Sequence, residues 1–83
     1  MIHFADVSKS ERLQRVLSLL ADGQEHTTME IIHGANVCAV NSIITEIRRN
    51  GYEIITKDNG YRNGSRVYSY RWPQSEQVAL NVR

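Results

Sequence analysis

The sequence predicts an α+β domain in which three helices precede a β-hairpin. Two stretches carry apolar residues at the i, i+3, i+4, i+7 spacing of an amphipathic helix, namely Leu13, Val16, Leu17 and Leu20, and later Val40, Ile43, Ile44 and Ile47. After residue 51 the pattern changes to β-branched and aromatic residues, which is typical of strands. A chain of 83 residues fits one small domain. We expect residues 8–72 to fold, with 1–7 as an N-terminal extension and 73–83 as a C-terminal tail.

The first helix is expected over about residues 9–22. Ser8 followed by Glu11 forms a capping-box pattern at its start, in which each side chain caps a backbone amide of the other. Gly23 supplies the residue at which a helix commonly ends.

A short second helix is expected over about residues 28–34. Thr27 and Glu30 repeat the capping-box pattern, and Gly34 ends the helix early. Its apolar contacts would come from Met29, Ile31 and Ile32. The connector "QEH" at 24–26 can add a brief strand to a sheet.

The third helix is expected over about residues 37–50. Asn36 is a favourable N-cap, and Gly51 stands where a helix C-terminus favours glycine. Arg48 and Arg49 lie in the last turn, where the helix dipole favours cations.

Two strands follow, "YEIITKD" at 52–58 and "RVYSYRW" at 66–72. The intervening segment 59–64, "NGYRNG", contains two Asn-Gly pairs, which are strong turn signals. We expect a hairpin with a loop longer than two residues. Tyr68, Tyr70 and Trp72 share one face of the second strand, and such a row mostly fills the core, with Tyr68 as the expected exception.

A short helix, a tight turn with glycine and a longer helix make a helix-turn-helix, and the hairpin after it makes a wing. The stretches that carry this pattern are "RLQRVLSLLADGQEHTTMEII", "NSIITEIRRNGYEIITK" and "RVYSYRW", and the most specific part is I-x-E-I-R-R-N-G-Y-x-I at 44–54. They resemble the winged helix-turn-helix superfamily, and more narrowly the short helix-turn-helix domain common in bacteriophage and prophage proteins. The resemblance spans about residues 8–72. It implies double-stranded DNA as partner, with the third helix in the major groove.

The outer face of the third helix carries short side chains, which would allow close approach to a groove. Asn41 can pair with adenine, and Ser42 or Thr45 can reach a base edge or phosphate, while Arg48 and Arg49 suit phosphate or guanine. In the wing, phosphate contacts are expected from Lys57, Arg62 and Arg66. The alternative is a solvated helix face whose arginines only complement the dipole, beside a hydrophilic loop.

Charge supports an anionic partner mildly. The net charge is +1, but residues 1–35 have three basic against five acidic side chains, and residues 36–72 have six against three. With 41% hydrophobic and 23% charged residues the chain is not of the disordered class. Nothing resembles a membrane span, a secretory signal, a phosphate-binding glycine loop or a nucleophile elbow. We therefore expect no enzyme.

No cofactor or metal is expected either. The single cysteine, Cys38, cannot form an internal disulfide, and it makes no zinc-type spacing with His3, His26 or His33. The chain is expected in the cytoplasm of a bacterial host, on the nucleoid, in phage transcription regulation, recombination or replication.

Two other functions stay open. One is a winged-helix module for protein–protein interaction, such as a phage factor that binds a host protein, and the other is a fragment of a larger replication initiator. The sequence also leaves open a homodimer.

Overall fold

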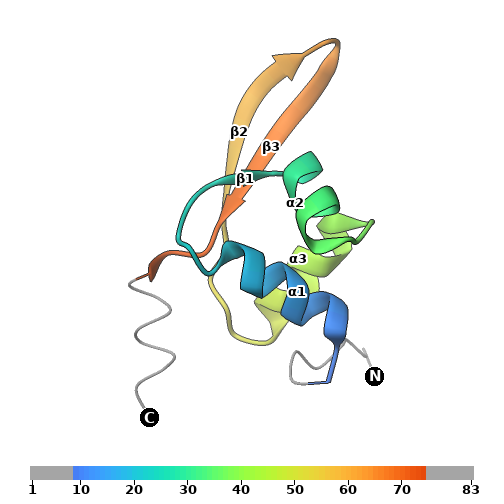
Figure 1. The fold of residues 1–83 in the computed structure, drawn as a ribbon. Helices are drawn as coiled ribbons and strands as arrows, with labels where there is room; N and C mark the ends of the chain where they lie inside the picture. The colour runs from blue at the N-terminus through green and yellow to red at the C-terminus, as the bar shows by residue number, and fades with distance from the viewer. Residues whose placement is uncertain (1–8, 75–83) are drawn as a thin grey trace.

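The computed structural model describes residues 9–74, in which three helices precede a β-hairpin and a short strand between the first two helices completes a small antiparallel sheet (Figure 1). The elements are α1 (Glu11–Leu20), β1 (His26–Thr27), α2 (Thr28–Ala35), α3 (Val40–Arg49), β2 (Ile55–Arg62) and β3 (Ser65–Arg71). The strand order is β1-β3-β2. The α+β class and the winged-helix layout are thereby confirmed. The expected extension 1–7 and residues 75–83 of the tail lie outside the described residues.

Helix α1 begins at a different cap from the predicted one. Ser10, in an extended conformation, is the N-cap, and its hydroxyl accepts a hydrogen bond from the Leu13 amide at 3.4 Å. The prediction of Ser8 as the cap was wrong, and Ser8 itself lies outside the described residues. The apolar face is confirmed, since Leu13, Val16, Leu17 and Leu20 are all buried.

Helix α2 has the capping box that the sequence predicted. The Glu30 amide donates to the Thr27 hydroxyl at 3.2 Å, and the Thr27 amide donates to the Glu30 carboxylate at 2.7 Å. Gly34 does not end this helix. The helix continues to Ala35, and Asn36 is the C-cap in the left-handed region, with φ 54°. Gly34 instead permits close packing on α1, because a Cβ there would lie 3.1 Å from a methyl carbon of Leu19.

Helix α3 starts three residues later than predicted. Asn36 caps the end of α2 rather than the start of α3, and the N-cap is Ala39, which is left-handed and offers no capping side chain. The predicted stop at Gly51 is confirmed. Its φ is 96°, its amide donates to the Arg48 carbonyl at 3.0 Å, and the Tyr52 amide reaches the Ile47 carbonyl at 3.5 Å. These paired bonds are the Schellman pattern that favours glycine.

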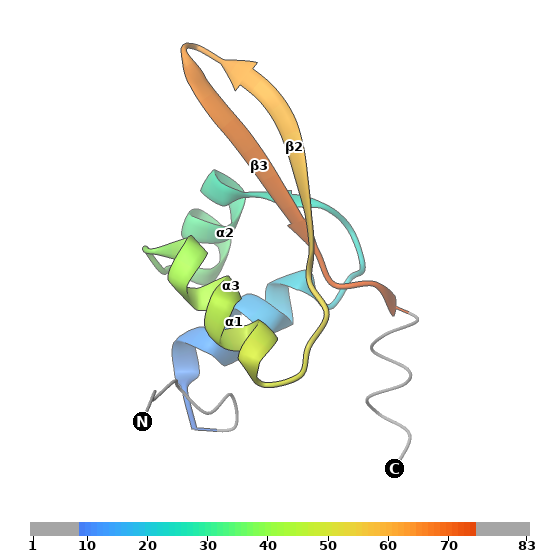
Figure 2. The ribbon, with the colours of Figure 1, turned by 180° about the vertical axis from the view of Figure 1, so that it is seen from behind.

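The hairpin turn is tighter than predicted. Arg62 pairs with Ser65, so the turn is only Asn63-Gly64, both at positive φ as a type I′ turn requires. The first Asn-Gly pair lies inside β2, where the register shifts between Asp58 and Tyr61 and forms a bulge. The strands therefore extend through the segment predicted as a loop. In Figure 2 the hairpin projects well beyond the helices.

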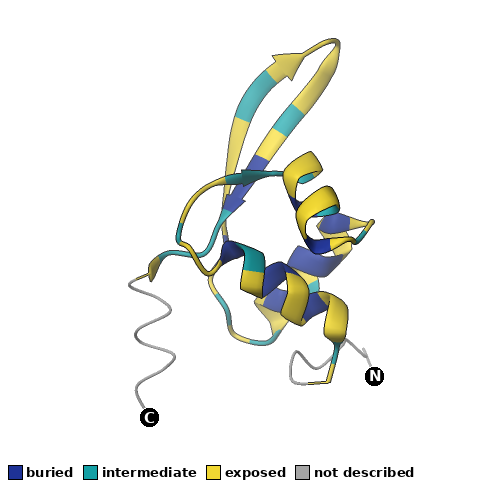
Figure 3. Ribbon diagram, in the orientation of Figure 1, coloured by how far each residue is buried: buried dark blue, intermediate teal, exposed yellow. Residues whose placement is uncertain are grey.

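The core lies between the helices and the base of the sheet (Figure 3). Strand β1 joins the sheet by pairing with β3, which confirms the brief strand that the sequence allowed. Tyr70 is buried, and Trp72 packs edge to face against Tyr52 with ring centroids 5.3 Å apart. Tyr68 is 38% exposed, the exception that the sequence predicted. Within residues 9–74 no helix combines the length and apolarity that crossing a bilayer requires.

Candidate nucleic-acid interface

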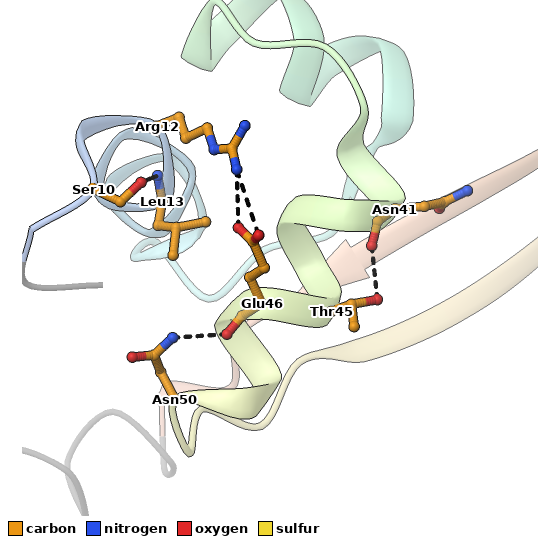
Figure 4. A network of polar contacts seen from close by, with 7 residues as sticks. All are labelled: Ser10, Arg12, Leu13, Asn41, Thr45, Glu46 and Asn50. Atoms are coloured by element: carbon orange, nitrogen blue, oxygen red, sulfur yellow. Dashed lines mark hydrogen bonds and ion pairs between the residues drawn. The ribbon is translucent and has the colours of Figure 1, made fainter. Parts of the chain in front are cut away.

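The outer face of α3 is polar, short-chained and open to solvent. Asn41, Ser42, Thr45 and Arg49 are exposed, whereas Val40, Ile43, Ile44 and Ile47 are buried. The four exposed residues line one shallow depression together with Glu46. Glu46 also receives an ion pair from Arg12 of α1 at 3.2 Å, which ties the two helices together (Figure 4). Apart from Arg49 and Glu46 toward its C-terminal end, this face carries short side chains that would let a groove approach closely.

Two of the predicted base-proximal residues are held by internal hydrogen bonds. The Thr45 hydroxyl donates to the Asn41 carbonyl at 2.9 Å (Figure 4). The Asn41 side-chain oxygen accepts from the Tyr70 hydroxyl, also at 2.9 Å. Within residues 9–74 the Asn41 amide nitrogen has no hydrogen-bond partner. Its donors are therefore available to a ligand.

An open groove of about 890 Å³ connects α3 to the wing. Its polar lining includes Asn41 and Ser42 from α3, and Arg62 and Arg66 from the wing. Its apolar lining includes Met29, Ile32, Val40, Val67 and Tyr68. The fold thus brings the predicted helix residues and two of the predicted wing cations to one surface.

The two arginines at the end of α3 have different environments. The Arg48 guanidinium donates to the Ile54 carbonyl at 2.6 and 3.2 Å and to the Thr56 hydroxyl at 2.7 Å, and so braces the start of the wing. Arg49 is exposed and makes no hydrogen bond or ion pair with any described residue. Arg49 is therefore the freer of the two for phosphate.

Arg48→Ala should lower the free energy of unfolding by about 1–2 kcal/mol, because the Ile54 carbonyl loses a charged hydrogen-bond donor. Arg49→Ala removes the same side chain from the same helical turn and should change it by less than about 0.5 kcal/mol. Urea titrations of both variants measure this. Equal effects would contradict the bracing role of Arg48.

The wing cations also differ. Arg66 forms an ion pair with Asp58, donates to the Tyr61 hydroxyl at 3.3 Å, and lies 4.6 Å from the centre of the Tyr61 ring. The Gly60 amide, and after it Arg66, hold the pKa of Asp58 below its ordinary value, so this carboxylate stays charged beside Arg66. Arg62 has no such partner among the described residues. The Arg62 charge is therefore more available to an anionic ligand than the Arg66 charge.

Lys57 is not brought together with the other predicted residues. Its neighbour in β2, Thr56, faces α3 through Arg48, and successive strand residues point to opposite faces. The Lys57 ammonium instead lies 3.8 Å from the Glu25 carboxylate, which also accepts from Ser69.

No pattern in the sequence indicates that Tyr70 takes part in this site. It was assigned to the core, which its ring does fill, but its hydroxyl reaches a residue 29 positions away. No local pattern signals such a contact. Met29 is a second difference, since it was expected to pack inside and is 58% exposed at the groove.

Acidic, histidine and cysteine side chains do not gather into a metal site among the described residues. His26 pairs with Asp22 at 3.0 Å. The Gln24 amide, and after it His26, lower the pKa of Asp22.

No protein-family model, curated protein or solved structure matches this chain. The order of its elements and the register of its sheet make the fold winged-helix-like.

Proposed function

We propose that this protein binds double-stranded DNA, with α3 in the major groove and the β2–β3 wing along the backbone or in the minor groove. The observation that carries the proposal is the common surface of α3 and the wing. Asn41 and Ser42 line the same groove as Arg62 and Arg66. Base edges and phosphates lie side by side on a duplex. A protein that contacts both therefore needs short polar side chains next to cationic ones.

The dimensions of α3 suit this role. Its 10 residues span about 15 Å at 1.5 Å per residue. The major groove, roughly 12 Å wide, admits a helix whose outer side chains are short. Helix α2 packs beside α3.

The charges support the same orientation. Arg49 stands at one end of the exposed α3 face, and Arg62 stands on the wing at the other side of the groove. Neither has an acidic partner among the described residues. Two free cations on either side of a row of short polar groups favour a polyanion that runs across the helix.

We propose a regulatory or accessory role in a bacteriophage or prophage, in transcription, recombination or replication. The support is the resemblance of the stretch 44–54 and its surroundings to phage helix-turn-helix domains. The site of action would be the nucleoid of the bacterial host.

A second candidate function is binding of a protein partner. The observation that favours it is the apolar part of the groove, where Met29 is 58% exposed beside Ile32 and Val67. Exposed apolar surface of this kind often marks a protein contact.

One binding experiment separates the two functions. Fluorescence anisotropy with a random duplex of about 20 base pairs, two helical turns, should show binding at about 50 mM salt. If three phosphates are neutralised, affinity should fall roughly 40-fold by about 200 mM salt. Met29→Gln removes apolar character from the groove without adding charge, and should leave DNA affinity unchanged. Absence of wild-type binding at low salt would refute the DNA proposal.

A further inference from the structure

We infer that Asn41 reads a base edge as a hydrogen-bond donor, and that Tyr70 is the positioning residue which fixes this choice. The inference rests on the proposed function and deepens it. It names guanine as the base that faces residue 41, in place of the adenine that an unrestrained asparagine favours.

Tyr70 is a rigid anchor for this contact. It lies in β3, the central strand of the sheet, where it pairs with His26 on one side and Thr56 on the other. It is 4% exposed, so its ring cannot move without disturbing the core. Its hydroxyl lies 2.9 Å from the Asn41 side-chain oxygen. The bond joins the sheet to the exposed face of α3.

Asn41 lies at a position from which a side chain can contact a base edge. It is exposed in the first turn of α3. It lines the groove between α3 and the wing, the depression on the outer face of α3, and a further depression beside Tyr70. In Figure 4 its side chain extends away from the helix, with the amide nitrogen at the outer end. The bound oxygen is directed to Tyr70, and the free nitrogen presents its two donors outward.

The orientation determines which base edge fits. Asparagine pairs with adenine by accepting from N6 and donating to N7, so it needs its oxygen as well as its nitrogen. In this protein the oxygen is already directed to Tyr70. Guanine presents two acceptors, O6 and N7, in the major groove, while cytosine presents a donor. A group that only donates therefore fits guanine, with two acceptors, better than adenine or thymine, which present one acceptor each, and it is rejected by cytosine.

Selection from a library of random duplexes tests the Asn41 part. The wild type should enrich guanine at one position. Asn41→Ala should lose the guanine preference at that position. Asn41→Asp should change it to cytosine, because Tyr70 holds one carboxylate oxygen and the other accepts from the cytosine amino group.

Tyr70→Phe tests the positioning part. It removes the hydroxyl, keeps the ring and frees the Asn41 oxygen, so adenine should rise against guanine at that position by about fivefold or more. Tyr68→Phe is the matched control, since that tyrosine lines the same groove and its hydroxyl does not contact Asn41. Circular dichroism checks that each variant is folded. If Tyr70→Phe does not fold, the Asn41 variants alone test the inference.

The outcomes separate the inference from the proposed function. If the wild type binds duplex but the Asn41 variants keep its base preferences, or if it has no preference at any position, the inference fails while DNA binding stands. If Tyr70→Phe behaves like Tyr68→Phe, the positioning role fails. If the wild type does not bind duplex at low salt, the function and the inference both fail.

Discussion

Ile44→Ala should lower the free energy of unfolding by about 2–5 kcal/mol, the usual cost of truncating a buried aliphatic side chain. Ile44 is 2% exposed in the middle of α3, within the core that joins all three helices to the sheet. A domain of this size has a total stability of roughly 5–10 kcal/mol, so the variant should lose a large fraction of its stability.

Urea or thermal unfolding followed by circular dichroism measures this cost. Ile55→Ala is the matched control, because it makes the same truncation at a residue that is 42% exposed in β2. Its cost should be below about 1 kcal/mol. An Ile44→Ala cost below about 0.5 kcal/mol would mean that the buried face of α3 is misassigned.

Arg49→Ala combined with Arg62→Ala should weaken binding to random duplex by about tenfold or more at low salt. The reason is that these two cations stand on either side of the exposed α3 face and have no acidic partner among the described residues. Each lost phosphate contact should also reduce the slope of log affinity against log salt by about 0.9. The double variant should therefore lose about 1.8 from that slope.

Lys57→Ala combined with Arg71→Ala is the control with the same change in net charge. Thr56 and Tyr70 pair on the sheet face toward α3, and Lys57 and Arg71, the next residue of each strand, point to the other face. Affinity and salt slope should change little. If both double variants lose affinity equally, binding follows net charge and not the surface of α3 and the wing.

The helices were predictable because their signals are local. The two apolar stripes and the Thr27–Glu30 capping box each lie within one or two helical turns, and the structure has them as expected. The boundary of α3 was not predictable from Asn36. Asparagine serves both as an N-cap and as a left-handed C-cap, and here the second role prevails.

The wing illustrates a second ambiguity of local signals. Asn59-Gly60 and Asn63-Gly64 are equivalent as turn signals, but only one pair can lie at the tip of a two-residue turn. The other pair becomes a bulge, in which the Gly60 amide donates to Asp58 at 2.8 Å. The choice depends on the register with β3, which is a property of the pairing and not of either segment.

The sequence allowed the residues of the candidate site to be predicted, but not the hydrogen bonds and ion pairs that they form. The exposed positions of α3 follow from the apolar period of the sequence. The separate environments of Arg48 and Arg49 depend on how the chain returns after Gly51, and the Asn41–Tyr70 bond depends on the docking of the sheet. These tertiary contacts separate the predicted cations. Arg48 braces the wing, Arg66 and Lys57 form ion pairs, and Arg49 and Arg62 have no acidic partner among the described residues.

The most direct test of DNA binding through α3 and the wing is an NMR titration of the ¹⁵N-labelled protein with duplex DNA at low salt. We expect the backbone amides that shift to lie in α3, from Asn41 to Arg49, and in the wing around Arg62, with little change on the exposed face of α1. The absence of shifts, or shifts confined to α1 or to the apolar lining of the groove around Met29, would contradict it.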